Sequence, residues 1–166
     1  GMVHKSAWLS GLLSVLCRYL VDGPCPGFLI TANIAGSGKS ILADIISIIA
    51  TGRKIPATAY KKNEDEMKKS IMSILMAAKQ FILFDNIENG GVFGGSAIDA
   101  LLTSSTYSDR PLATNSMPEL VVSTVFFATG NQITFAGDSL RRFITVKIKS
   151  YLQSPELRQV SDFKIK

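Results

Sequence analysis

The stretch from Phe28 to Ser40 reads FLITANIAGSGKS, and the expected fold follows from it. An apolar run predicts a strand, a glycine-rich turn comes next, and residues 41–50 predict a helix. Glycine lets the backbone N–H groups of such a turn point inward, and the helix adds the positive end of its dipole. Together these three segments predict a site for a bound anion.

The turn follows the phosphate-binding pattern G-x-x-x-x-G-K-[ST] except at its first position, where Asn33 replaces glycine. Asparagine tolerates the left-handed backbone region better than most residues, so the pattern is expected to hold. Lys39 is expected to reach the outer phosphates of ATP, and Ser40 to place its hydroxyl on Mg²⁺. The alternative is a chance strand, turn and helix with a lysine at the helix start. The predicted nucleotide-binding residues are Asn33, Ile34, Ala35, Gly36, Ser37, Gly38, Lys39, Ser40 and Ile41.

A second motif lies at 81–88, where the sequence reads FILFDNIE. The continuous apolar run predicts a strand buried on both faces, and Asp85 follows that run directly. As in P-loop NTPases, Asp85 is expected to hold the Mg²⁺ that Ser40 contacts. A carboxylate at a strand end is common, so Asp85 alone is weak evidence for a metal site. The evidence becomes stronger in combination with the predicted phosphate-binding turn.

Apolar spacing and turn residues predict the other elements. Asn63 is expected to cap a charged helix, and the apolar stripe of the first helix is expected to face the core. The glycine-rich stretch at 89–95 is expected to be a mobile loop that exposes Phe93, and 107–118 is expected to be irregular. The expected helices are 5–20, 41–50, 63–78 and 97–104, and the expected strands are 28–32, 56–60, 81–84, 120–128 and 143–148.

Strands and helices alternate along the chain, which predicts right-handed crossovers and a mainly parallel sheet. The expected fold is therefore α/β, with five strands flanked by helices. Ligands of such folds bind at the carboxyl ends of the strands. By this rule 33–40, 85–88 and Asn131 fall on one edge of the sheet.

Length and composition favour a single globular domain, because 166 residues with 46% hydrophobic side chains are enough for one core. Its expected parts are an N-terminal helix and linker at 2–27, a core at 28–149 and an extension at 150–166. Cys17, Cys25 and a single histidine fit neither a zinc site nor a disulfide framework, so a cytoplasmic location is expected. No signal peptide or membrane span is expected, and the net charge of +5 is compatible with a polyanionic partner.

Four motifs, in this order, resemble the AAA+ ATPase core over about 28–149. NIAGSGKS corresponds to the Walker A loop, FILFDN to Walker B, FFATGN to the sensor 1 strand and SLRRF to the arginine-finger region. The resemblance implies a three-layer P-loop NTPase fold without a lid domain that binds ATP and Mg²⁺ and forms a ring. It also implies that Asn131 is the sensor and that Arg142, or else Arg141, is the finger.

The stretches FDNIENGGVFGGSAIDALLTS and ATGNQITFAGDSLRRF resemble, more narrowly, the ATPase part of primase–helicase proteins of phages and integrated mobile elements. This resemblance implies a motor domain that hydrolyses ATP and acts on single-stranded or forked DNA. The candidate DNA contacts are Tyr60, with Lys61 and Lys62 beside it, and Phe93. The simpler interpretation of both segments is an ordinary loop.

One departure from the family bears on mechanism. In many AAA+ enzymes the residue after the Walker B aspartate is a glutamate that polarises the attacking water, whereas here it is Asn86. An amide can orient water but cannot accept its proton. On a strand, Asn86 and Glu88 point to the same face about 7 Å apart, so Glu88 is the candidate base if the strand ends early. Otherwise hydrolysis is expected to be slow until a partner completes the site.

Several alternatives remain open at this point. For Arg142 the alternative to a finger is a salt bridge to Asp138 or Glu119, and Arg110 is a weaker candidate for a subunit or phosphate contact. For the whole chain, Asn86 makes a nucleotide-dependent switch or loader with little hydrolysis the main alternative to a motor. A kinase or another P-loop transferase is a third hypothesis, but the sequence offers no obvious acceptor site.

Overall fold

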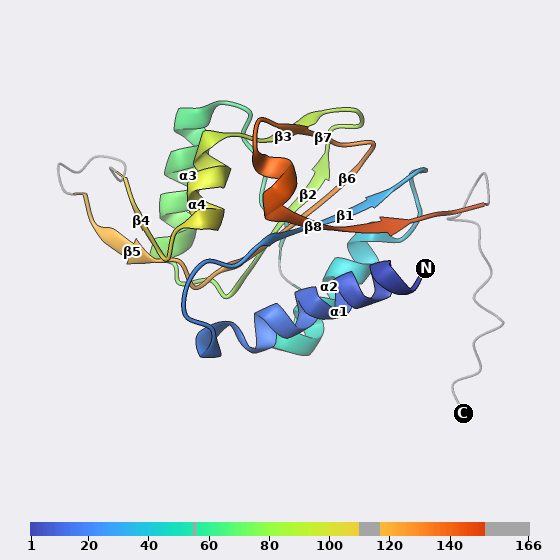
Figure 1. Ribbon diagram of the computed structural model, residues 1–166, viewed down its shortest axis with the longest axis horizontal. Coiled ribbons are helices and arrows are strands. Elements are labelled where there is room, and N and C mark those ends of the chain that lie inside the picture. Colours follow the sequence, from blue (N-terminus) through green and yellow to red (C-terminus); the bar gives the residue numbers. More distant parts are fainter. Residues whose placement is uncertain (55, 110–116, 152–166) are drawn as a thin grey trace.

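Parallel strands form the centre of the computed structural model, which describes residues 1–54, 56–109 and 117–151 (Figure 1). The strands of this sheet are β1 (Gly27–Ala32), β2 (Phe81–Ile87), β6 (Val125–Asn131) and β8 (Phe143–Ile148). Their order is β2, β6, β1, β8, and each neighbouring pair runs parallel. The carboxyl ends of β1, β6 and β2 therefore lie side by side, with Ala32 opposite Asn131.

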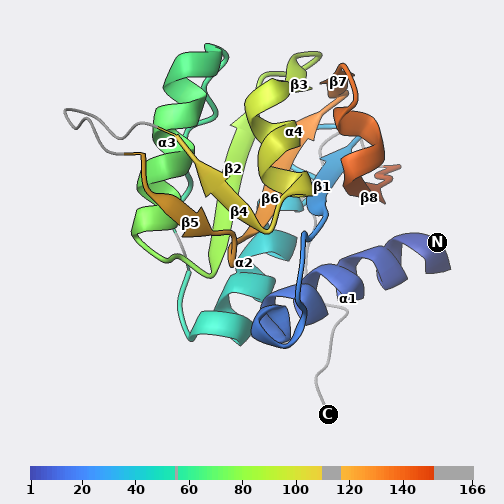
Figure 2. The same cartoon turned by 60° about the vertical axis from the view of Figure 1, so that its left-hand side comes forward.

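Helices cover both faces of the sheet (Figures 1 and 2). On one face lie α1 (Met2–Leu16) and α2 (Lys39–Thr51), and on the other lie α3 (Glu64–Met76) and α4 (Ser96–Thr103). Asn63 caps α3 as expected, because its side chain accepts a hydrogen bond from the Glu66 N–H at 3.1 Å. The prediction of an α/β fold with a mainly parallel sheet is confirmed.

The alternation of side chains along the strands explains the two buried cores. Phe28 and Ile30 of β1 face α1 and α2 and join one hydrophobic cluster, whereas Leu29 faces α3 and α4 and joins the other. Both faces of a parallel sheet between helices are buried, which is why β1, β2 and β6 read as nearly continuous apolar runs. This burial fixes the register that brings the strand ends together.

Short elements extend the described part of the fold at both ends of the sheet. β3 (Val92–Gly94) pairs with β7 (Thr134–Ala136) in parallel, and β4 (Thr106–Ser108) pairs with β5 (Glu119–Val121) in antiparallel fashion. Two 3₁₀ turns are present: η1 (Arg18–Leu20) follows α1, and η2 (Ser139–Arg142) precedes β8. The predicted strand 120–128 is thus divided between β5 and β6, because the first part pairs with β4 instead of joining the main sheet.

The predicted fifth strand is not confirmed. Within 56–60, Thr58 makes an isolated bridge to Phe84 of β2, and the described sheet has four strands. Pro56 lacks the N–H that a ladder needs, which explains why the pairing does not extend at that end.

The prediction of an exposed Phe93 was wrong. Phe93 lies in β3 with none of its surface exposed, and its ring packs against those of Tyr60 and Phe143 at centroid distances of 4.9 and 5.2 Å. The glycines around it give the backbone the left-handed turns that carry this aromatic ring into the core, with φ of 68° at Gly90 and 108° at Gly94. Glycine here serves a close-packed turn and is no sign of a mobile loop.

The first helix forms largely as predicted, but its apolar side chains do not all face inward. Trp8 and Leu12 pack against the core, whereas Leu9, Leu13 and Leu16 are exposed to between 46% and 56%.

Among the described residues, no helix combines the length and hydrophobicity that crossing a bilayer requires. Arg110 and 152–166, which include most of the predicted extension, lie outside the described residues.

Candidate functional site

The candidate site lies at the carboxyl edge of the sheet, where three strands end next to one another. The predicted anion-binding turn follows β1, Asp85 lies near the end of β2, and Asn131 ends β6. The structure forms two hydrogen-bonded pairs at this edge, Lys39 with Asn131 and Ser40 with Asp85. These residues come from segments as far as 92 positions apart, so their meeting is a property of the fold.

The turn between β1 and α2 has the backbone that its glycines predict. Gly36 and Gly38 have φ of 70° and 89°, in the left-handed region where side-chain-bearing residues are strained. Gly38 is also the N-cap of α2, so the free N–H groups of the first helical turn open onto the same place. Ser37 steadies the turn, because its hydroxyl donates to the Ile34 carbonyl at 2.6 Å. This geometry suits an anion bound at the start of the helix.

Lys39 connects the turn to the central strand. Its Nζ donates to the Asn131 Oδ1 at 2.8 Å. Burial lowers the pKa of Lys39, and the nearby negative charge of Asp85 opposes that shift in part. A partly desolvated ammonium group beside a helix start is a strong attractor for a phosphate group.

Ser40 and Asp85 form the oxygen-rich part of the site. The Ser40 hydroxyl lies 3.1 Å from Asp85 Oδ1 and 3.3 Å from Oδ2. A hydroxyl and a carboxylate are the hard oxygen ligands that Mg²⁺ prefers, and this ion usually takes only one or two protein ligands beside phosphates and water. Among the described residues, no group of three or more His, Cys, Asp or Glu side chains could hold a metal ion. These two residues therefore fit a magnesium ion that arrives with a nucleotide.

Thr129 completes the surroundings of Asp85, and sequence reasoning missed it. Its hydroxyl makes a short hydrogen bond to Asp85 Oδ1 and accepts one from the Asn86 N–H at 3.0 Å. Thr129 is 1% exposed and sits in the apolar strand β6, so it looked like a core residue. The available signal was strand alternation, which places Thr129 on the same face as Asn131 two residues later.

The geometry of Asn86 and Glu88 differs from the expectation for a regular strand. β2 continues to Ile87, but its register shifts between Phe84 and Ile87, and Asn86 has a left-handed φ of 57°. The simple alternation that would align Asn86 with Glu88 is therefore interrupted. The Glu88 carboxylate instead forms a short ion pair with Lys62, and this hydrogen bond lowers the pKa of Glu88. A carboxylate with a lowered pKa is a weaker base.

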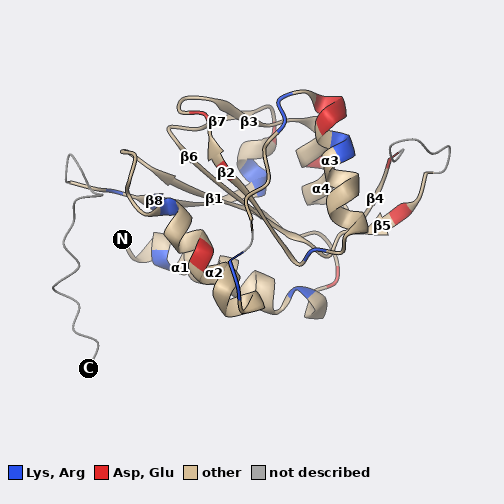
Figure 3. Cartoon of the chain, turned by 180° about the vertical axis from the view of Figure 1, so that it is seen from behind, with Lys and Arg blue, Asp and Glu red and all other residues tan. Residues whose placement is uncertain are grey.

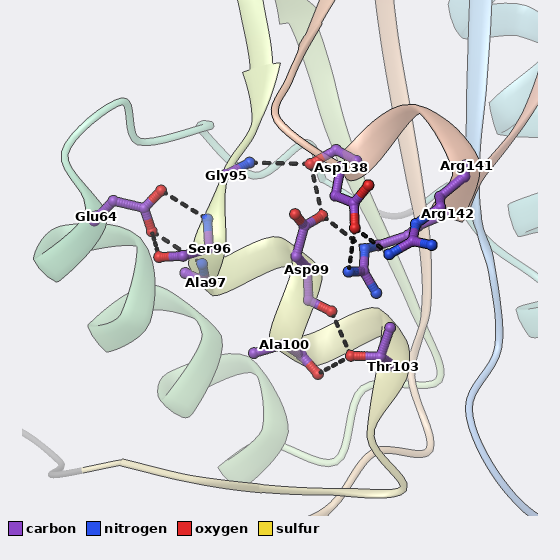
Figure 4. Close-up of polar contacts among 11 residues, drawn as sticks. Glu64, Gly95, Ser96, Ala97, Asp99, Ala100, Thr103, Asp138, Arg141 and Arg142 are labelled. Atoms are coloured by element: carbon purple, nitrogen blue, oxygen red, sulfur yellow. Dashed lines mark hydrogen bonds and ion pairs between the residues drawn. The ribbon is translucent and has the colours of Figure 1, made fainter.

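The two candidate finger arginines differ sharply in their surroundings (Figure 4). The side chain of Arg142 is 18% exposed, and its guanidinium lies within ion-pair distance of Asp99 at 3.2 Å and of Asp138 at 3.4 Å. Arg141 also pairs with Asp138, but its side chain is 71% exposed. The salt bridge from Arg142 to Asp138, considered above as the alternative to a finger, is thus present. Arg141 is the more accessible of the two.

The candidate DNA contacts are less accessible than the sequence suggested. The Tyr60 hydroxyl donates to the Gly94 carbonyl at 2.7 Å, and its ring belongs to the aromatic cluster around Phe93. Neither ring is therefore free to stack on a base. Figure 3 shows Lys and Arg distributed over several elements, among them the segment before α3 that carries Lys61 and Lys62.

No protein-family model matches the chain, and the curated proteins searched include no match to it. The chemistry of the site is accordingly inferred from the contacts of the described residues. A glycine-lined helix start, a half-buried lysine and a hydroxyl–carboxylate pair at one sheet edge suit a polyphosphate with its metal ion.

Proposed function

We propose that this chain is a Mg²⁺-dependent ATPase with a P-loop NTPase core of the AAA+ type. The observation that carries the proposal is the meeting of Lys39, Ser40, Asp85 and Asn131 beside the left-handed glycine turn at the start of α2. Each group has the chemistry that one part of a nucleotide–metal complex needs. The helices on both faces of the parallel sheet support a three-layer fold of this class.

The residues divide the work of phosphoryl transfer among them. The turn and the start of α2 bind the phosphates through backbone N–H groups, and Lys39 neutralises charge on the outer phosphates. Ser40 and Asp85 hold Mg²⁺, which when bound neutralises charge on the phosphate oxygens. Asn131 orients Lys39 and offers its amide to the reacting end of the nucleotide. Catalysis of this kind consists mainly of positioning and charge stabilisation.

The test of the nucleotide site is Lys39→Ala. Loss of a charge-assisted bond worth about 1.5–3 kcal/mol should weaken ATP binding by at least about tenfold, and the loss of the phosphate contact should leave no measurable turnover. Titration calorimetry with ATP and Mg²⁺ measures the affinity. Lys79→Ala is the matched control, because this exposed lysine precedes β2 at the opposite edge of the sheet. Equal affinities in Lys39→Ala and the natural protein would overturn the assignment.

The substrate on which ATP energy is spent is proposed to be DNA. The motifs at 84–104 and 128–143 resemble primase–helicase replication proteins of phages and integrated mobile elements, and the net charge of +5 suits a polyanion. A motor of this type works as a ring in which a neighbour supplies an arginine to the γ-phosphate. The exposure of Arg141 favours it over Arg142 for this role.

A second candidate function is a nucleotide-dependent switch or loader that hydrolyses little. Two observations favour it: the residue after Asp85 is Asn86, which accepts no proton, and Glu88 is held by Lys62. Steady-state turnover with and without single-stranded DNA separates the two functions. Turnover that rises with DNA indicates a motor, whereas tight ATP binding with no turnover under either condition indicates a switch.

A further inference from the structure

Thr129 occupies a position that the proposed function has not yet used. It lies in β6 between β1 and β2, and its side chain reaches the end of β2 from the neighbouring strand. A hydroxyl carries a single proton and accepts through its oxygen. The Thr129 hydroxyl donates to Asp85 Oδ1 and accepts from the Asn86 N–H, so its donor and its acceptor both bind the end of β2.

These contacts restrict the Asp85 carboxylate on one side. Oδ1 is surrounded by the Thr129 hydroxyl, by the Asn86 N–H at 3.0 Å and by Ser40 at 3.1 Å. Oδ2 has a single described partner, the Ser40 hydroxyl at 3.3 Å. The carboxylate is therefore anchored through Oδ1, and Oδ2 is the oxygen that is left to accept a further partner.

The backbone at Asn86 makes this anchor necessary. The register of β2 shifts between Phe84 and Ile87, so the regular ladder does not hold Asp85 at its place. Asn86 adopts a left-handed backbone that costs free energy unless its surroundings compensate. The hydrogen bond from the Asn86 N–H to Thr129 ties this irregular turn to the buried centre of the sheet, and the same hydroxyl fixes Asp85.

From this arrangement we propose that Thr129 is a positioning residue for the metal-binding carboxylate of Asp85. Thr129 does not touch the nucleotide; it sets the orientation in which Asp85 faces a Mg²⁺ ion. The proposal rests on the proposed function, since it concerns the same metal site. Partners that orient metal ligands in this way typically contribute 10–100-fold to metal affinity.

The experiment compares Thr129→Val, which removes the hydroxyl while keeping the shape, with Thr129→Ser, which keeps the hydroxyl. Titration calorimetry measures ATP affinity with excess Mg²⁺ and again with excess EDTA. In Thr129→Val the gain in affinity that Mg²⁺ provides should fall by about 10- to 100-fold, while affinity in EDTA stays that of the natural protein. Thr129→Ser should retain the gain. A merely structural role would lower both affinities together.

Further arms make the outcomes separable. In an Asp85→Asn background the Thr129→Val change should have no additional effect on the Mg²⁺ gain, and additive effects would overturn the proposal. If circular dichroism shows that Thr129→Val does not fold, the smaller Thr129→Ala replaces it. If Thr129→Ser loses the increase in ATP affinity that Mg²⁺ provides, the role of the hydroxyl is contradicted. If Thr129→Val keeps that increase unchanged, this inference fails and the proposed function is unaffected. Failure of the natural protein to bind ATP under either condition sinks the proposed function.

Discussion

Asn33 shows how one side chain can replace the residue that a pattern demands. It stands where the phosphate-binding pattern has glycine, yet its backbone is outside the left-handed region, so its conformational tolerance is not what the turn uses. Its amide instead donates to the Ser150 carbonyl at 2.9 Å and accepts from the Ser150 N–H at 3.0 Å. Asn33 thereby ties the turn between β1 and α2 to the chain just beyond β8.

Restoring the pattern by Asn33→Gly should therefore destabilise the protein. Two hydrogen bonds to Ser150 are lost and the chain gains freedom when unfolded, which together cost about 1–3 kcal/mol. Urea unfolding followed by circular dichroism measures the change. Asn89→Gly is the control, because Asn89 is an exposed loop residue and reports the cost of glycine alone. Equal losses of stability in the two variants would contradict the role of the amide.

The backbone of single residues could be predicted from the sequence where a local pattern determines it. The left-handed φ of Gly36 and Gly38 follows from the glycine-rich turn alone, and the roles of Lys39 and Ser40 stay predictions. The contact of Thr129 with Asp85 could not be predicted, because a threonine in an apolar strand is usually a core residue. Its role depends on which strand lies beside β2, and that is decided by the packing of the whole sheet.

Glu64 at the start of α3 acts on a different helix from its own. Its carboxylate accepts hydrogen bonds from the Ser96 N–H at 3.1 Å, the Ser96 hydroxyl at 3.0 Å and the Ala97 N–H at 2.9 Å (Figure 4). The N-cap residue of α4 is Gly95, which has no side chain to offer. A Cβ at Gly95 would lie 2.1 Å from the Glu64 carboxylate, so the glycine makes room for the cap.

Glu64→Ala should remove this cap and loosen the attachment of α4 to α3. The expected loss of stability is about 0.5–2 kcal/mol, as for other N-terminal caps. Asp65→Ala is the matched control, since Asp65 lies in the same turn of α3, is exposed and makes none of these contacts. Urea unfolding compares the two variants. A loss in Asp65→Ala as large as that in Glu64→Ala would point to the charge of the turn and not to the cap.

Among segments, those with a strong local pattern were predictable and those defined by partners were not. The helices α1, α2, α3 and α4 follow from their 3.6-residue apolar spacing, and α3 also from its cap residue Asn63. The stretch at 120–128 looks uniformly β-forming, but its first residues pair with β4 and its last with β1 and β2. Residues 56–60 pair with β2 only at Thr58, and at one end of the segment Pro56 lacks the N–H that a further ladder bond needs. Pairing partners far along the chain are invisible to local propensity.

At the scale of the whole molecule, the candidate site contains Lys39 as its described cation, and the proposed ring would add an arginine from a second copy. Asp85, Lys39 and Asn131 are in place within one chain, whereas no described residue other than Lys39 brings a positive side chain into hydrogen-bond contact with these groups. Arg142 is held by Asp99 and Asp138, and Arg141 remains largely exposed. If a neighbour completes the site, the function depends on assembly.

Mixing two inactive variants tests this dependence. The Lys39→Ala variant lacks the lysine of the candidate phosphate site but can still offer Arg141 to a neighbour. The Arg141→Ala variant retains Lys39 but has no Arg141 to offer. An arginine supplied in trans can contribute about 10³- to 10⁵-fold to the rate, so each variant alone should be nearly inactive. A mixture should regain turnover, and a non-hydrolysable ATP analogue should raise the molar mass measured by light scattering. Turnover in Arg141→Ala equal to that of the natural protein would remove Arg141 from the mechanism.

One strand, β6, contributes to both halves of the candidate site. Asn131 holds Lys39 across the seam with β1, and Thr129 holds Asp85 across the seam with β2. A mechanical force that separates β6 from β1 would release Lys39 from Asn131 and leave Asp85 in place. A force that separates β6 from β2 would release Asp85 from Thr129 and leave Lys39 in place. The direction of the force on this sheet thus decides which of the two side chains is released.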